Sequence, residues 1–223
     1  MRRWYPRQQP IRAMSVLNRM KAAIVVVVVG SLVSIAHADP KPTHCGADVA
    51  PFAVKLAAKP DKYEPVLALD GELKKYFAIT FPTGLDFDPG NKVVLQRATK
   101  RFNDWYAAKS QAAEQLSTKY AAILGMATNE QKIEVAARLG QVTDELAHEL
   151  ATAEIPGNVR RGEFAVEASK AFCEALTDKA EPLFTAAAEK YRVCADTAKQ
   201  QSISNDWTAW CDARLAILAP AKP

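Results

Sequence analysis

The sequence predicts an all-α protein of antiparallel helical hairpins, as in a helical bundle, preceded by an irregular proline-rich segment and stapled by disulfides. Three observations support this fold class. Apolar residues recur every three or four positions from about residue 91 to residue 218, which is the period of an amphipathic helix. Seven prolines divide residues 39–89 into short pieces. Four cysteines, an even number, occur in a chain that begins with an export signal, which favours two disulfides.

The first 38 residues have the three parts of a secretory signal peptide. Arg19 and Lys21 precede an apolar run, residues 22–35, and Ala36-His37-Ala38 provides a small-x-small cleavage site before Asp39. The alternative is a retained membrane anchor, but that requires about 18 or more apolar residues. We therefore expect cleavage, no stable membrane span afterwards, and export to the periplasm or cell envelope. We expect the true start at Met14.

The positive charge of the chain lies in the segment that cleavage would remove. The whole chain carries +4, and residues 1–38 hold six basic and no acidic residues. Removing those six from the 29 basic residues leaves 23 against 25 acidic ones. A mature form close to neutrality, with mixed charges, argues against nucleic acid as a partner.

Residues 39–89 are predicted to be irregular with short helices, because proline interrupts longer ones. Leu67 to Phe81 is interpreted as a helix followed by an extended stretch, Ile79 to Phe81, and a pair of strands is the alternative. The remaining residues, 90–219, are predicted to form one α-helical domain with short turns, which makes antiparallel neighbours the default.

The first long helix is predicted from about residue 91 to residue 125. Asp88 is a candidate cap with Pro89 at the first helical position, and Gly125 is a candidate end. Its inward stripe is Val94, Ala98, Phe102, Trp105, Ala112, Leu116, Tyr120 and Ile123.

The second helix is predicted to begin at a capping box formed by Thr128 and Gln131. Pro156-Gly157 is predicted to stop it. Its inward residues are Ile133, Ala136, Leu139, Leu146 and Leu150.

A third helical stretch begins near Glu163, and its apolar phase continues through Pro182. Either two helices meet at this proline or one long helix kinks there. The inward residues of this stretch are Phe164, Ala168, Phe172, Leu176, Ala180, Leu183, Ala187, Tyr191, Cys194 and Ala198. The last helix is predicted from about Asn205 to Leu218, with Trp207, Trp210, Cys211, Arg214, Leu215 and Leu218 on its inner side.

Hairpin geometry predicts the disulfides. If the last turn is Gln201 to Ser204, residues equidistant from its centre face each other, which pairs Cys194 with Cys211. Cys45 is then left to join the N-terminal segment to Cys173. The alternative pairing, Cys173 with Cys194, requires the chain to fold back sharply near Pro182.

Several stretches resemble one protein family. They are residues 136–141, 153–156, 171–176 and 179–183, followed by Cys194, Asn205-Asp206-Trp207 and Cys211. Together they resemble the C-terminal helical region of myxobacterial tetratricopeptide-repeat proteins associated with adventurous gliding motility. The resemblance covers roughly residues 95–218, and no string of 34-residue repeats lies upstream. It implies hairpins like those of tetratricopeptide repeats and a scaffold or adaptor in the cell envelope, and it adds nothing catalytic.

No catalytic, cofactor-binding or metal-binding set is predicted. His148 lies near Asp144, Glu145 and Glu149 on one helix, but a metalloprotease motif needs a second histidine where Thr152 stands. We therefore interpret His148 as an exposed histidine, and Asp144 and Glu145 as part of a solvated face. The Asp86-to-Asn91 stretch begins like a calcium loop, but Arg97 occupies its twelfth position, so it is interpreted as a turn.

Aromatic residues are the better candidates for binding. Trp105 and Tyr106 cannot both face inward, so we predict that one of them is partly exposed and contacts a partner. Trp207 is interpreted as core. The first functional hypothesis is a non-enzymatic envelope scaffold or adaptor with a protein partner. The alternative is a helical-bundle carrier of a small apolar ligand, and an enzyme is the third hypothesis.

Overall fold

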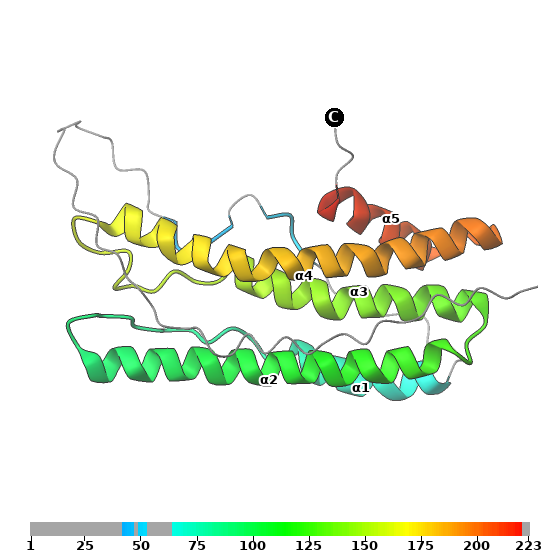
Figure 1. Ribbon diagram of the computed structural model, residues 1–223, viewed down its shortest axis with the longest axis horizontal. Coiled ribbons are helices and arrows are strands. Elements are labelled where there is room, and N and C mark those ends of the chain that lie inside the picture. The colour runs from blue at the N-terminus through cyan, green and yellow to red at the C-terminus, as the bar shows by residue number, and fades with distance from the viewer. Residues whose placement is uncertain (1–41, 47–48, 53–63, 220–223) are drawn as a thin grey trace, which may run out of the picture. The chain divides into compact units, whose positions relative to one another are not determined.

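The computed structural model describes residues 42–46, 49–52 and 64–219, and the regular structure of this part of the chain is helical. Five helices follow one another (Figure 1): α1 Glu64–Phe77, α2 Lys92–Leu124, α3 Asn129–Ala151, α4 Ala165–Gln201 and α5 Asp206–Leu218. The described residues contain no β-sheet, only an isolated antiparallel bridge between His44 and Glu154. The predicted all-α class is confirmed. The predicted signal peptide, residues 1–38, lies outside the described residues.

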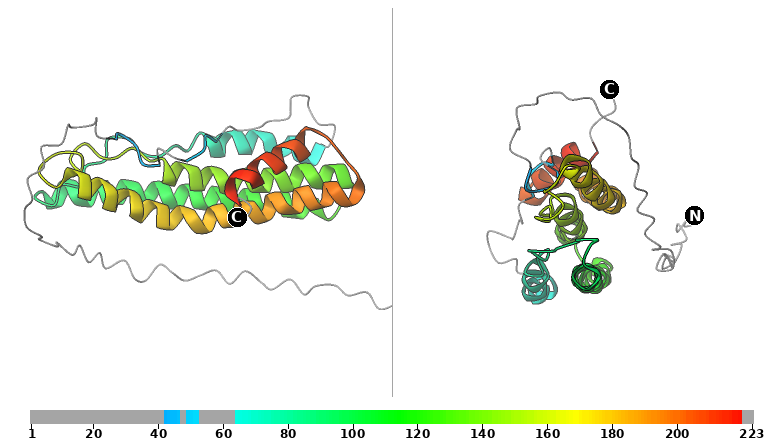
Figure 2. Two further views of the ribbon diagram at one scale, coloured as in Figure 1. Left: turned by 90° about the horizontal axis from the view of Figure 1, so that it is seen from above. Right: turned by 90° about the vertical axis from the view of Figure 1, so that its left-hand side faces the viewer.

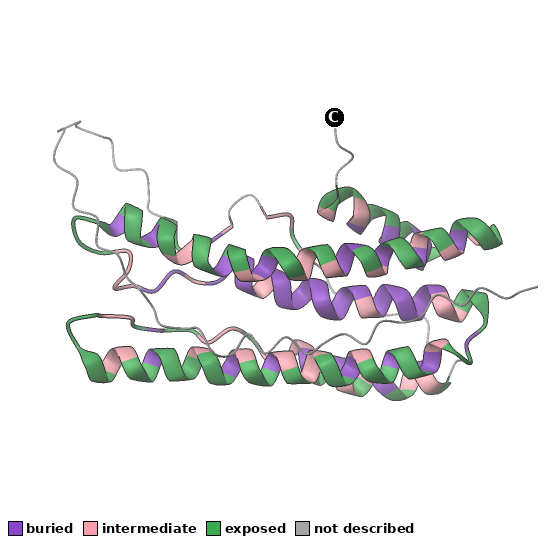
Figure 3. Cartoon of the chain, in the orientation of Figure 1, coloured by how far each residue is buried: buried purple, intermediate pink, exposed green. Residues whose placement is uncertain are grey.

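Helix α3 lies in the middle of the bundle, with α1 and α2 on one side and α4 and α5 on the other (Figure 2). A surface helix buries one stripe, but α3 is covered from both sides and is buried nearly all round (Figure 3). Its partners α2 and α4 are buried along one face only. None of the described helices is both long enough and apolar enough to cross a membrane.

Most of the predicted stripes are confirmed. The stripe on α2 buries Ala98, Trp105, Leu116, Tyr120 and Ile123, and that on α4 buries Leu176, Ala180, Ala187, Tyr191, Cys194 and Ala198. Phe164 and Ala168 are the exceptions: Phe164 precedes the first residue of α4 and is 63% exposed, and Ala168 is exposed as well.

The observed helix caps confirm two of the predicted capping signals and correct a third. Thr128 and Gln131 form the predicted capping box, and Gly125 caps the end of α2 as predicted. The prediction of Asp88 as the cap of α2 is wrong. Asn91 is the cap, and its side chain accepts a hydrogen bond from Val94 N at 3.2 Å. Asp88 instead accepts one from Gly90 N at 2.9 Å and closes the preceding turn.

Helix α4 runs through Pro182 as a single helix, which decides between the two alternatives. A proline within a helix removes one hydrogen bond, the one that would reach the carbonyl of Asp178. Asp178, Glu181 and Pro182 are all exposed, so water can satisfy that carbonyl. Ser202 caps the C-terminus of α4 and adopts a left-handed conformation with φ 52°.

Both predicted disulfides are confirmed. Cys194 joins Cys211 with a Cα–Cα distance of 6.3 Å, and Cys45 joins Cys173 with a Cα–Cα distance of 5.3 Å across 128 residues. The alternative pairing of Cys173 with Cys194 is excluded, because both lie in the same continuous helix. Their 21-residue separation places them about 30 Å apart along its axis.

The helix predicted from Leu67 is confirmed as α1, which begins three residues earlier. It has 14 residues, more than the short helices that the prolines suggested, and Pro65 occupies its second position, where a proline is tolerated. Its buried residues are Val66, Leu69, Leu73 and Tyr76, which pack against α2. The predicted extended stretch, Ile79 to Phe81, forms no strand.

Helix α3 ends at Ala151, five residues before Pro156, so the predicted stop at Pro156-Gly157 is wrong. The chain leaves the helix because residues 153–155 form the bridge to the N-terminal segment. Cys45 N donates to Ala153 O at 2.9 Å, and Ile155 N donates to Thr43 O at 2.8 Å.

Helices α3 and α4 approach each other closely at Gly140. A Cβ atom at this position would lie 2.5 Å from the ring of Tyr191, which is itself fully buried. Glycine is therefore required at this crossing by the packing of the two helices.

Candidate functional site

Two hollows lie along α4 in the described part of the chain. The first, which we call the α4 groove, has a volume of about 260 Å³. It is lined by Pro42, His44, Gly46, Ile155, Ala165, Val166, Ser169, Lys170 and Cys173. Val166 on its wall is 66% exposed, and Ser169 is 7% exposed. The groove is thus an apolar hollow that is open to solvent on one side.

The walls of the α4 groove are held together by covalent and hydrogen bonds. The Cys45–Cys173 disulfide fixes residues 42–46 to α4, and the bridge to residues 153–155 fixes them to the end of α3. Gly46 is needed in this segment, because its φ of +61° is left-handed and an added Cβ would lie 2.4 Å from Ala151 O.

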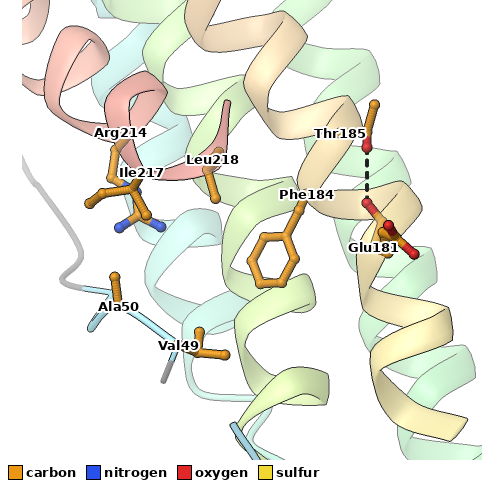
Figure 4. Close-up of a pocket in the computed structure, with 8 residues that line it drawn as sticks. All are labelled: Val49, Ala50, Glu181, Phe184, Thr185, Arg214, Ile217 and Leu218. Carbon is orange, nitrogen blue, oxygen red and sulfur yellow. Dashed lines mark hydrogen bonds between the residues drawn. The ribbon is translucent and has the colours of Figure 1, made fainter. Parts of the chain in front are cut away.

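The second hollow, the Arg214 pocket, has a volume of about 400 Å³. It is lined by Val49, Ala50, Glu181, Phe184, Thr185, Arg214, Ile217 and Leu218. Figure 4 shows that residues of α5 and of segment 49–50 lie on one side, and that Phe184 of α4 points toward them. The carbonyl of Glu181 accepts a hydrogen bond from Thr185 Oγ1 at 3.1 Å.

Arg214 itself is held by a buried ion pair. Its Nε and Nη2 donate to the two oxygens of Asp144 at 2.8 and 2.9 Å, and the hydroxyl of Tyr191 donates to Asp144 Oδ2 at 3.1 Å. Burial raises the pKa of Asp144, and the hydrogen bonds from Arg214 and Tyr191 act in the opposite direction. The guanidinium is 5.4 Å from the ring centre of Phe52. This geometry suits a structural contact between α3 and α5.

A second buried cluster surrounds Lys109 of α2. Its ammonium donates to Tyr76 O at 3.0 Å, to Ile79 O at 2.8 Å and to Glu145 Oε1 at 2.8 Å. These three bonds use all three donors of the lysine. The carboxylate of Glu149 lies 3.7 Å away and receives none of them.

The two carboxyl groups of this cluster compete for one positive charge. Burial and the nearby charge of Glu145 raise the pKa of Glu149 to about 7, and burial also raises the pKa of Glu145. Neither Glu145 Oε2 nor Glu149 Oε2 has a hydrogen-bond donor among the described residues. A proton shared by the two carboxyl groups near neutral pH satisfies both oxygens.

A third cluster joins α3 to α1. Arg138 contacts Glu134 Oε1 at 2.8 Å and Asp70 Oδ1 at 2.6 Å. Its guanidinium lies 5.2 Å from the ring centre of Trp207. Burial also raises the pKa of Tyr120, which packs in the same region, to about 12. All three clusters therefore lie between helices.

The polar residues of α3 are the main error of the sequence interpretation. Asp144 and Glu145 were interpreted as solvated, but they are 0% and 6% exposed because α3 is covered on both sides. His148 was interpreted as exposed, yet it is half-buried, its ring centre lies 5.9 Å from that of Phe52, and burial lowers its pKa. Lys109 was missed altogether.

The structure separates the two aromatic residues that were predicted as partner contacts. Trp105 is 7% exposed and belongs to the core, whereas Tyr106 is half-buried and stacks on Phe102 at 6.2 Å. Lys179 of α4 lies 5.8 Å from the Tyr106 ring centre. The prediction that one of the pair is partly exposed is confirmed, and Tyr106 is that residue. The predicted core position of Trp207 is confirmed at 9% exposure.

The described residues include no group of three or more histidine, cysteine, aspartate or glutamate side chains placed to hold a metal ion. All four cysteines are in disulfides. The described residues form interhelical contacts inside the bundle and line two hollows along α4. Comparisons with protein-family models, with curated proteins and with solved structures found no match to this chain.

Proposed function

We propose that this protein is an exported, non-enzymatic helical scaffold that acts as an adaptor in the periplasm or cell envelope and binds a partner protein at the α4 groove. The observation that carries this proposal is an apolar hollow, open to solvent, on a rigid bundle. The resemblance to gliding-motility proteins suggests an envelope complex of that type as the setting. Two disulfides are typical of an oxidising compartment, which agrees with export.

The size of the groove favours a protein partner over a small molecule. Its volume of about 260 Å³ lies below the roughly 300–1,000 Å³ of ordinary ligand pockets. Val166 leaves much of its apolar side chain in water, as residues of contact surfaces do. The buried charges bind one another across helix interfaces, so they support rigidity of the platform rather than chemistry at its surface.

A site-specific cross-link tests the adaptor function. Val166 is replaced by the photoreactive benzoylphenylalanine in the native host, and envelopes are irradiated. Val193 is the matched control, since it lies on the same helix and is 53% exposed, far from the groove. We expect one discrete adduct from position 166 and none from position 193. Equal labelling at both positions, or no adduct at 166, contradicts the proposal.

A second function, a carrier of a small apolar ligand, is favoured by the Arg214 pocket. Its volume of about 400 Å³ falls within the range of ligand sites, and Phe184, Ile217 and Leu218 give it an apolar wall. Organic extraction of protein purified from its native envelope, followed by mass spectrometry, tests this function. A carrier should release a stoichiometric compound that the pocket-filling variant Ile217→Trp loses, and the adaptor should release none.

A further inference from the structure

The extended segment along one wall of the α4 groove has an edge on which the backbone of His44 makes no hydrogen bond with another described residue. In the bridge to residues 153–155, the contacts are made by Thr43 O and Cys45 N. Successive residues of an extended strand direct their N–H and C=O groups to opposite sides. The N–H and C=O of His44 therefore face away from the bridge. Pro42, His44 and Gly46 line the groove, so it lies against one face of this segment, and a strand paired through the His44 backbone groups would direct every second side chain to that face.

The other wall of the groove is apolar and can accommodate one apolar side chain of a bound peptide. Ala165, Val166 and Cys173 come from one face of α4, and Ile155 comes from the bridge. Strand addition obtains affinity from main-chain hydrogen bonds and specificity from pockets for alternate side chains. The groove combines a strand edge with one such pocket.

The positive charge of Lys170 at the groove favours a bound peptide that carries a carboxylate. Lys170 is the one charged residue among the nine that line it. Its side chain is 74% exposed and lies 3.7 Å from Glu174, which is itself 63% exposed. An exposed ion pair at this distance contributes little stability, so Lys170 can instead bind a carboxylate of the peptide.

We propose that the α4 groove binds an extended segment of a partner as a strand added beside residues 42–45, with an apolar side chain in the groove and a carboxylate next to Lys170. This inference rests on the proposed adaptor function and specifies how the partner is held.

A matched pair of variants tests the strand edge. His44→Pro removes the outward N–H but keeps both bonds of the bridge, and proline is tolerated on a strand edge. His44→Ala removes only the imidazole. The probe is a phage-displayed library of random decapeptides, selected on the full exported chain with both disulfides formed. We expect selected peptides to share an apolar residue and an Asp or Glu. We expect His44→Pro to weaken their binding about tenfold, which corresponds to one main-chain hydrogen bond, and His44→Ala to leave it unchanged.

A second measurement remains informative if His44→Pro fails to fold. The selected peptide is synthesised with N-methyl groups at alternate positions, in both registers. A peptide added as a strand tolerates methylation in one register and loses binding in the other. No selected peptide, equal binding to His44→Pro and wild type, or equal effects of both methylation registers overturns the inference.

The two proposals fail in different ways. If the cross-link from Val166 persists in the His44→Pro background, the adaptor function stands and strand addition is wrong. If wild-type protein gives no such cross-link, the adaptor function itself fails.

Discussion

Replacing Glu149 by glutamine should make the stability of the protein less sensitive to pH. Lys109 uses its three donors elsewhere, so the Glu149 carboxylate lies in a largely buried position without a donor, and its pKa rises from 4.5 to about 7. Between these values the folded protein holds a proton that the unfolded chain has lost. The free energy of unfolding therefore falls as the pH rises through this window.

The size of the effect follows from the shift. A rise in the pKa from 4.5 to about 7 corresponds to roughly 3 kcal/mol. Because the Glu149 side chain is only 16% exposed, solvent screening removes little of this. Glu149→Gln resembles the protonated carboxyl, so it should match wild type near pH 5 and be about 3 kcal/mol more stable at pH 8. For a domain of this size, that is a difference of roughly 6–12 °C in Tm.

Urea unfolding followed by circular dichroism at pH 5, 6, 7 and 8, with the disulfides intact, measures the effect. His148, whose pKa is lowered by burial, is present in both proteins, so its contribution cancels in the difference. Glu114→Gln, an exposed position on α2, is the control and should follow wild type at every pH. Parallel curves for wild type and Glu149→Gln would refute the shared-proton interpretation of the Lys109 cluster.

Three further predictions concern packing, the ion pair and export. Gly140→Ala should lower the free energy of unfolding, because the new Cβ meets a buried tyrosine ring at 2.5 Å. Gly71→Ala, with no atom within 4 Å, should raise it by roughly 0.5–1 kcal/mol, and urea unfolding giving the same sign for both would contradict the packing argument. Arg214→Met should cost about 3–5 kcal/mol and the added Asp144→Leu should recover most of it; equal losses in the single and double variants would count against this. N-terminal sequencing of protein recovered from its native envelope should begin at Asp39, and an uncleaved terminus would show the signal interpretation to be wrong.

The helices and the Cys194–Cys211 disulfide were predictable because their signals are local, and the Cys45–Cys173 disulfide then followed by elimination. A capping box needs only Thr128 and Gln131, and the pairing of Cys194 with Cys211 needs only the position of one turn. The prolines displaced only the predicted start of α1 from Glu64 to Leu67, because Pro65 lies at the second position of the helix rather than before it. The end of α3 was also misplaced, because a distant segment takes residues 153–155 out of the helix.

The buried charges could not be located in the same way, because their partners are far apart in the sequence. Lys109 and Glu145 are 36 positions apart, and Asp144 and Arg214 are 70 apart. One signal was present. Lys109 follows Trp105 by four residues, so it lies within the apolar stripe of α2, where a charge requires a buried partner. A charged residue in phase with an apolar stripe therefore predicts a buried ion pair, although it does not name the partner.

The positions of these ion pairs explain how an alanine-rich bundle keeps one arrangement. Small side chains let helices approach closely, but they give little resistance to sliding by one turn. The polar contacts of α3 are directional and reach three different neighbours: Asp70 on α1, Lys109 on α2 and Arg214 on α5. Helix α4 is positioned on α3 by the tyrosine ring that packs on Gly140, and the two disulfides hold its N-terminal half and its C-terminal end. Sliding α1, α2 or α5 past α3 by one turn would leave a buried charge unpaired, which is far more costly than the loss of a few apolar contacts. The α4 groove thus lies on a bundle whose register is determined by buried ion pairs on α1, α2 and α5 and by packing and disulfides on α4.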